Sequence, residues 1–138
     1  MSHIGNKIRM GYFRTPDKQG EYIKQLLEFT GDCSILDPTA GEGLILQQLA
    51  KNHEHDIVTY GVELDNKRAE IAKTKIDHLV HAPLESMVIT NEVFSMIYLN
   101  PPYDFEMRGE DGENAMRKEY KFLIQSTRYL AKHGVLVY

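Results

Sequence analysis

The sequence lacks the features that would cross-link a small domain or place it in a membrane. It has one cysteine, Cys33, in 138 residues, which excludes an internal disulfide framework and favours a reducing compartment. No apolar run approaches the roughly 18 residues of a membrane span. Residues 1–12 hold no apolar core of signal-peptide length. These absences predict a cytoplasmic protein with no membrane partner.

An excess of basic charge is also absent. Lys and Arg number 16 against 20 Asp and Glu, which gives a net charge of −4 with neutral histidines. This balance excludes a basic arm and a uniformly basic nucleic-acid binder, but it leaves a local basic face open. Hydrophobic residues make up 42% and charged residues 26%, as in globular proteins. The length fits one domain over residues 1–138.

Apolar runs and helical periodicity alternate along the chain. Strands are expected at 34–36 (ending at Asp37), 56–62, 79–80, 94–99 and 135–137. One helix is expected to start with Thr15 as N-cap and Pro16 at N1 and to stop at Gly31. Further helices are expected at 44–50, 66–78 and 120–131, the last after a charged loop at 104–119. Such alternation predicts a parallel α/β sheet, in which ligands bind beyond the carboxyl ends of the strands.

The first candidate motif is the turn after the first strand, Asp37-Pro38-Thr39-Ala40-Gly41-Glu42-Gly43. Two glycines allow a tight turn and a close approach of the backbone to a ligand, and the following helix start offers free N–H groups. The dinucleotide pattern G-x-G-x-x-G fails, because Leu46 stands in its last position. The alternative is an ordinary strand-to-helix turn that binds no ligand.

The second candidate is Glu63, at the end of the second strand. A carboxylate about 20 residues after a glycine turn can accept hydrogen bonds from two ribose hydroxyls. Glu63 is preferred to Asp65 because it lies closer to the strand end. The alternative is a carboxylate that only stabilises a helix N-terminus, and this structural role is assigned to Asp65.

The third candidate is Asn100-Pro101-Pro102-Tyr103, after the fourth strand. The prolines remove two N–H donors and fix the backbone. Carbonyl and amide oxygens beside an aromatic face then form a receptor for a planar amine. A proline turn that merely closes a strand is the alternative.

Together, these motifs resemble class I S-adenosylmethionine-dependent methyltransferases, above all the N6-adenine-specific DNA methyltransferases of the Asn-Pro-Pro-Tyr group. Gly11-Tyr12-Phe13, followed by Thr15-Pro16, resembles the segment that precedes the cofactor motif in those enzymes. The resemblance implies a Rossmann-like three-layer sandwich with a mainly parallel sheet in the order 3-2-1-4-5. It also implies S-adenosyl-L-methionine as cofactor and a nucleic acid substrate, DNA in the first place.

The resemblance also implies a role for each matching residue. The methionine end of the cofactor would contact Phe13 and Thr15. Its middle would lie along Asp37, Pro38, Thr39, Ala40, Gly41 and Gly43. Glu63 would hold the ribose, with Leu64 beside it, and Pro83 or Leu84 would pack on the adenine. Asn100, Pro101, Pro102 and Tyr103 would form the catalytic motif that holds the target amine.

The sequence departs from the family pattern at two places. Where the family often has Asp followed by an apolar residue after the third strand, the sequence reads His81-Ala82-Pro83-Leu84-Glu85, without a carboxylate at the position that contacts the adenine amine. The family sheet has seven strands, and the fifth predicted strand ends this sequence. We therefore expect the N-terminal part of a longer protein, with a C-terminal target-recognition region or a partner chain elsewhere.

Other reactive side chains do not form a competing site. His53 and His55 lie in a loop without further ligands at metal spacing, so no metal is expected. Cys33 precedes the first strand and is no positioned nucleophile, which disfavours a covalent cytosine mechanism. The predicted reaction is methyl transfer to adenine N6. RNA guanine-N2 methylation, protein glutamine methylation and a cofactor-binding module inactive on its own remain alternatives.

Overall fold

The computed structural model describes residues 14–101 and 112–138. Its strands are β1 (Cys33–Asp37), β2 (Ile57–Glu63), β3 (His78–His81), β4 (Phe94–Tyr98) and β5 (Leu130–Val137). Its helices are α2 (Asp17–Gln25), α3 (Leu44–Ala50), α4 (Asn66–Ala72) and α5 (Gly112–Thr127), with a 3₁₀ turn, η1, at Leu84–Ser86.

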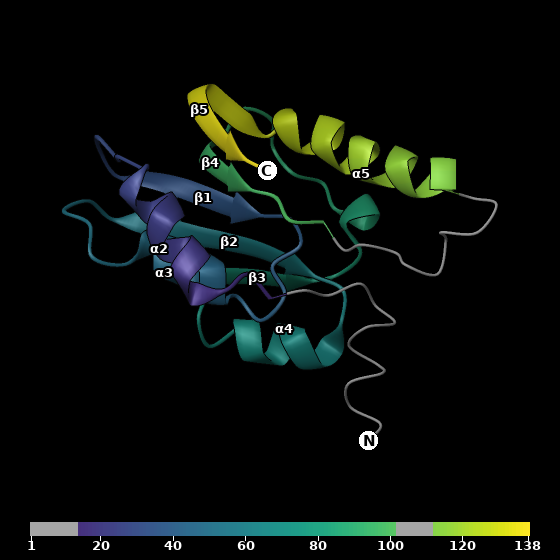
Figure 1. Cartoon of the computed structure of the whole chain (residues 1–138), viewed down its shortest axis with the longest axis horizontal. Helices are drawn as coiled ribbons and strands as arrows, with labels where there is room; N and C mark the ends of the chain where they lie inside the picture. Colours follow the sequence, from purple (N-terminus) through teal and green to yellow (C-terminus); the bar gives the residue numbers. More distant parts are fainter. Residues whose placement is uncertain (1–13, 102–111) are drawn as a thin grey trace.

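The strands form one five-stranded parallel sheet in the order β3-β2-β1-β4-β5, which confirms the predicted order. Every strand therefore ends at the same edge, toward which the arrows point in Figure 1. β2 and β3 lie on one side of β1, whereas β4 and β5 lie on the other. Right-handed crossovers then place α3 and α4 on one face and α5 on the opposite face, as in a three-layer sandwich.

The core explains why the strands are almost continuously apolar. Ile35 in β1 packs in one core cluster with Leu46 and Leu49 of α3, whereas Ile97 in β4 belongs to a second cluster with Leu36 and Tyr129; Ile35 and Ile97 are both completely buried. A strand covered on both faces has no solvent-facing row to fill with polar residues. Polar side chains therefore gather where the strands end.

The first helix starts differently from the prediction. Pro16 occupies the N-cap position, and α2 ends at Gln25 instead of continuing to Gly31. Thr15 is not the cap: its hydroxyl lies 2.6 Å from the hydroxyl of Tyr98, at the end of β4. A long-range hydrogen bond thus replaces the local cap that the sequence indicates.

The helix predicted over 66–78 ends at Ala72. Its start agrees with the prediction, because Asp65 is the N-cap and accepts a hydrogen bond from the backbone N–H of Arg68 at 2.9 Å. Downstream, the Asp77 carboxylate accepts two hydrogen bonds from Thr59, each at 2.8 Å. These bonds fix the chain beside β2 and bring His78 into β3 instead of the helix.

The last helix and strand also lie outside their predicted bounds. α5 begins at Gly112, inside the predicted loop of 104–119, and ends at Thr127 instead of 131. β5 begins at Leu130 instead of 135, and its register against β4 shifts between Phe94 and Met96. His133, with φ 64°, lies within this irregular stretch. Because of this irregularity, the residue pattern does not indicate a strand before residue 135.

Within the described ranges, none of the helices has the length and apolar character needed to cross a bilayer. Cys33 is a free thiol. The cytoplasmic location stays a prediction.

Candidate functional site

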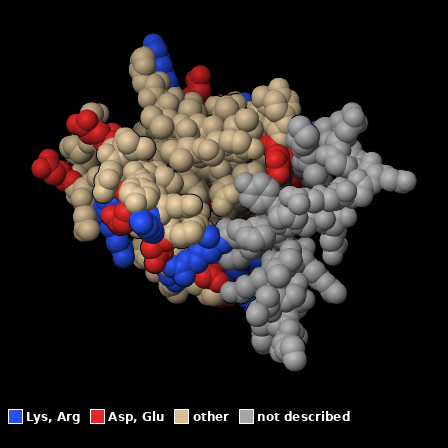
Figure 2. Space-filling view, viewed as in Figure 1, with Lys and Arg blue, Asp and Glu red and all other residues tan. Residues whose placement is uncertain are grey.

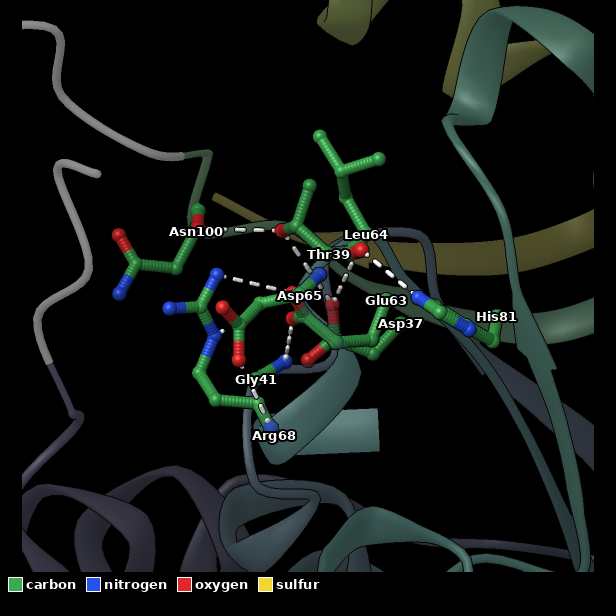
Figure 3. Close-up of polar contacts among 9 residues, drawn as sticks. All are labelled: Asp37, Thr39, Gly41, Glu63, Leu64, Asp65, Arg68, His81 and Asn100. Atoms are coloured by element: carbon green, nitrogen blue, oxygen red, sulfur yellow. Dashed lines mark hydrogen bonds and ion pairs between the residues drawn. The ribbon is translucent and has the colours of Figure 1, made fainter. Parts of the chain in front are cut away.

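The predicted site residues that the structure describes meet at the carboxyl edge of the sheet. Asp37 ends β1, Glu63 ends β2 and Asn100 follows β4. These are adjacent strands in the order β2-β1-β4, and Figure 3 shows the three side chains around the turn that follows β1. Parallel pairing therefore brings together residues up to 63 positions apart in the sequence.

The glycine turn adopts the backbone that its sequence predicts. Gly41 and Gly43 have φ of 58° and 78°, in the left-handed region that favours glycine. The Ala40 N–H donates to the Val62 carbonyl at 2.8 Å, which ties the turn to β2. A Cβ on Gly43 would lie 3.0 Å from the Ile76 side chain. The turn is thus fixed by conformation and by packing.

Asp37 is an acidic group in the protein interior. It is 2% exposed, and one carboxylate oxygen accepts a hydrogen bond from the Thr39 N–H at 2.9 Å. Burial raises the pKa of the Asp37 carboxyl to about 7; the Thr39 N–H opposes this rise, and the charge of Glu63 adds to it. Asp37 therefore changes its charge near neutral pH.

This pKa predicts a pH-dependent stability. The folded protein holds a proton on Asp37 up to about pH 7, whereas the unfolded chain releases it near its ordinary pKa of 3.8. The stability that Asp37 contributes is therefore present at low pH and is lost as the pH rises through 7. In urea unfolding, we expect the stability of the wild type relative to Asp37→Asn to fall between about pH 5 and about pH 8.

The exposed residue Asp32 provides the control for this experiment. Asp32→Asn should leave the pH dependence of the wild type in place, because no comparable burial acts on that side chain. A stability difference between wild type and Asp37→Asn that stays constant over this pH range would show that Asp37 does not take up a proton on folding.

Glu63 is held by four N–H donors. It is 6% exposed. Its Oε2 accepts a hydrogen bond from the Gly41 N–H at 2.8 Å, and its Oε1 accepts one from the Asp65 N–H at 2.7 Å. The Arg68 guanidinium also donates to Oε1, from Nε at 3.2 Å and from Nη2 at 2.9 Å. The carboxylate thus connects the glycine turn, the end of β2 and the start of α4.

Asn100 is joined to the glycine turn. The Thr39 hydroxyl donates a hydrogen bond to the backbone carbonyl of Asn100 at 3.1 Å. This hydrogen bond joins the start of the Asn100 turn to the glycine turn after β1. Asn100 is half-buried and Pro101 is buried.

The remaining predicted cofactor residues differ in exposure. Leu64 is 59% exposed and Pro83 is exposed, whereas Leu84 is 4% exposed within η1. The His81 ring lies 2.9 Å from the Leu64 carbonyl. Pro38 and Ala40 are buried in the glycine turn. Phe13, Pro102 and Tyr103 lie outside the described residues.

The sequence gives no direct signal for two residues at this edge. Tyr98 is an ordinary buried strand residue by pattern, and its contact with Thr15 depends on packing. Arg68 is an ordinary helix residue by pattern; only its spacing of five from Glu63 hints at a contact. His53 lies apart from the site, where its ring contacts Phe29 edge-on and bonds to the Leu49 carbonyl.

Strand order and the glycine turn after β1 define the class of this protein as a Rossmann-like methyltransferase fold. Residues 1–138, the whole chain, match the model of an uncharacterised methyltransferase family, DUF6094. The chain belongs to that family. The resemblance to methyltransferases that the motifs indicate is therefore confirmed.

The chain is similar to longer proteins. A Type II methyltransferase, M.CvrRI, of Paramecium bursaria Chlorella virus XZ-6E is 28% identical over 134 residues, which are 91% of this chain and 35% of the viral protein. The methyltransferase subunit of a type I restriction-modification system from Streptococcus thermophilus has a TM-score of 0.70 at 18% identity, covering 90% of this chain and 33% of that one.

A methyltransferase from Geobacter sulfurreducens, solved with S-adenosyl-L-homocysteine, has a TM-score of 0.58 at 16% identity and covers 88% of this chain and 47% of that one. This chain thus spans about a third of the viral relative and less than half of either solved structure.

Proposed function

We propose that this chain carries the cofactor site and the catalytic motif of an S-adenosylmethionine-dependent methyltransferase that acts on adenine N6 in DNA. The observation that carries the proposal is the hydrogen bond between Thr39 and the Asn100 carbonyl, at the edge where Glu63 also lies. A methyl donor held by the glycine turn would lie next to an amine held by the Asn100 turn. The viral methyltransferase, similar over most of the chain, supports a DNA substrate.

The residues at this edge fit S-adenosylmethionine as cofactor. Asp37 and Glu63 are buried acidic groups, suited to a ligand that carries a sulfonium charge and a ribose diol. The exposed Leu64 offers apolar surface beside Glu63. We assign the cofactor to Phe13, Thr15, Asp37, Pro38, Thr39, Ala40, Gly41, Gly43, Glu63, Leu64, Pro83 and Leu84. When bound, S-adenosylmethionine supplies a methyl group activated by the sulfonium.

The chain's own contribution to catalysis is position and polarity. The nitrogen lone pair of an exocyclic amine is delocalised into the ring, so the amine is a weak nucleophile. The Asn100 amide oxygen and the Pro101 carbonyl would each accept a hydrogen bond from one of the two amine N–H groups. These bonds would favour a pyramidal, more nucleophilic nitrogen. Because the Asn100 backbone carbonyl is bonded to Thr39 of the glycine turn, the Asn100 turn would hold the amine in line for transfer.

We assign the base-holding role to Tyr103, the last residue of the motif. A base in a duplex must be flipped out of the stack, which costs a few kcal/mol. Stacking of the flipped base on an aromatic ring contributes about 1–3 kcal/mol to binding, which offsets part of this cost. We therefore expect Tyr103→Ala to raise KM for DNA with little change in kcat, and Tyr103→Phe to keep the wild-type KM. A large fall in kcat for Tyr103→Phe would assign the hydroxyl to the chemistry instead.

Target recognition is assigned to protein beyond these motifs. In Figure 2, acidic and basic side chains are interspersed on the described part of the visible face, in line with the net charge of −4. We propose that residues 1–138 form part of a methyltransferase domain. A C-terminal region or a partner chain, as the greater length of the relatives suggests, would contact the DNA phosphates.

The test is transfer of tritiated methyl groups from S-adenosylmethionine to unmethylated DNA, to RNA and to protein, assayed in parallel with the full-length protein. We expect label in DNA alone. Label in RNA or protein would move the activity to another amine, such as guanine N2 or a glutamine amide. No transfer to any of the three would favour a cofactor-binding module without activity.

A further inference from the structure

The carboxylate of Glu63 has no room for both hydroxyls of a ribose. A carboxylate offers about four lone-pair positions, two on each oxygen. Its Oε1 already receives three N–H donors, one from Asp65 and two from Arg68, and its Oε2 receives the Gly41 N–H. One position on Oε2 is left for a hydroxyl, and Oε1 has none.

The four N–H donors differ in how easily they can move away from the Glu63 carboxylate. The N–H groups of Gly41 and Asp65 belong to the backbone, one in the fixed glycine turn and the other at the N-cap of α4. The remaining two belong to the side chain of Arg68, whose guanidinium points at Glu63 in Figure 3. Rotation of one side chain is therefore the smallest change that opens Oε1.

We propose that Arg68 is a latch on Glu63 that the cofactor ribose displaces. The inference rests on the proposed function, in which Glu63 binds both ribose hydroxyls. In the ligand-free protein, Arg68 neutralises a carboxylate that is 6% exposed. On binding, one ribose hydroxyl donates to the open position on Oε2, and the other takes the place of the guanidinium on Oε1. Arg68 thus lowers the affinity for the ribose and keeps Glu63 paired while the site is free.

A latch and a positioning role predict opposite results when Arg68 is removed. The bonds of a latch exist only in the free protein, so their loss raises the free energy of that state alone and tightens binding. An arginine that orients Glu63 in the complex would weaken binding when removed. Calorimetry with S-adenosylhomocysteine separates the two. We expect Arg68→Met to bind about ten-fold more tightly than the wild type, the equivalent of about one charge-assisted hydrogen bond.

Two controls isolate the latch from the general effect of charge. Lys73→Met removes one positive charge just after the same helix and breaks only the exposed pair with Glu70; its affinity should equal that of the wild type. The 2′-deoxy analogue of S-adenosylhomocysteine needs only one acceptor, which Oε2 provides. The gain in Arg68→Met should therefore vanish with this analogue. Thermal unfolding should show a lower midpoint for the free variant and a larger rise on adding S-adenosylhomocysteine.

The possible results of these binding measurements distinguish failure of the latch from failure of the proposed cofactor site. Equal or weaker binding of S-adenosylhomocysteine by Arg68→Met would overturn the latch and leave the proposed cofactor site intact. An equal gain in Lys73→Met, or an undiminished gain with the deoxy analogue, would also overturn it in favour of simple charge. If neither wild type nor variant bound S-adenosylhomocysteine, the cofactor site and the latch would both be wrong.

Discussion

Replacement of Asn100 by alanine is expected to lower kcat for methyl transfer by about 10²–10³-fold, the usual effect of removing one preorganised acceptor from a transition state. The Asn100 side chain is half-buried at the end of β4, and its backbone is held by Thr39. The truncation therefore removes an acceptor without releasing the turn. Affinity for S-adenosylhomocysteine should stay near the wild-type value, because Asn100 is assigned to the target and not to the ribose.

The matched control is Asn91→Ala. Asn91 is exposed and precedes the other end of β4, so the same substitution there should leave kcat unchanged. Normal methylation kinetics for Asn100→Ala in the full-length protein would mean that the Asn-Pro-Pro-Tyr turn is structural.

The second large effect is expected for Glu63→Ala. Two hydrogen bonds from the ribose to a charged acceptor contribute roughly 1.5–3 kcal/mol each. Displacement of Arg68 offsets about one ten-fold step of this gain, so calorimetry should show cofactor affinity reduced by at least about ten-fold in the variant. The variant also leaves the N–H groups of Gly41 and Asp65 without their acceptor. We therefore expect a lower midpoint of thermal unfolding as well.

Asp65→Ala separates the loss of binding from the loss of stability. Asp65 caps α4 by accepting the Arg68 N–H, and removal of such a cap costs about 1 kcal/mol of stability. Its carboxylate has no role in the proposed ribose contact, so cofactor affinity should change little. Equal losses of affinity in the two variants would mean that Glu63 acts through the local fold and not by contact with the ribose.

The sheet and its functional edge are predictable from the sequence because they depend on strong, local signals. The short apolar run of β4, closed by Asn100 and Pro101, favours a buried strand, and the glycines at 41 and 43 fit a turn that needs positive φ. Parallel order then brings Asp37, Glu63 and Asn100 to one edge without further information.

The contacts within the site are not predictable in the same way. Thr15 is a good N-cap by type, yet it bonds to Tyr98, 83 positions away. Glu63 is an expected ribose ligand by position, but nothing in its own segment reveals that Arg68 fills one oxygen. The predicted end of the helix that starts at residue 66 is wrong for a related reason. No helix-breaking residue ends this helix; the hydrogen bonds from Thr59 to Asp77 bring the chain after α4 into β3. Such long-range partners exist only once the fold is formed.

The central claim is that the turn after β4 presents an exocyclic adenine amine to a methyl donor held by the turn after β1. The most direct test is mass spectrometry of nucleosides from unmethylated DNA that has been incubated with the full-length protein and S-adenosylmethionine carrying a deuterated methyl group. The account predicts one labelled product, N6-methyladenine, which Asn100→Ala forms about 10²–10³-fold more slowly than the wild type and Asn91→Ala forms at the wild-type rate. Label in 5-methylcytosine, or N6-methyladenine formed equally by the Asn100 variant, would contradict it.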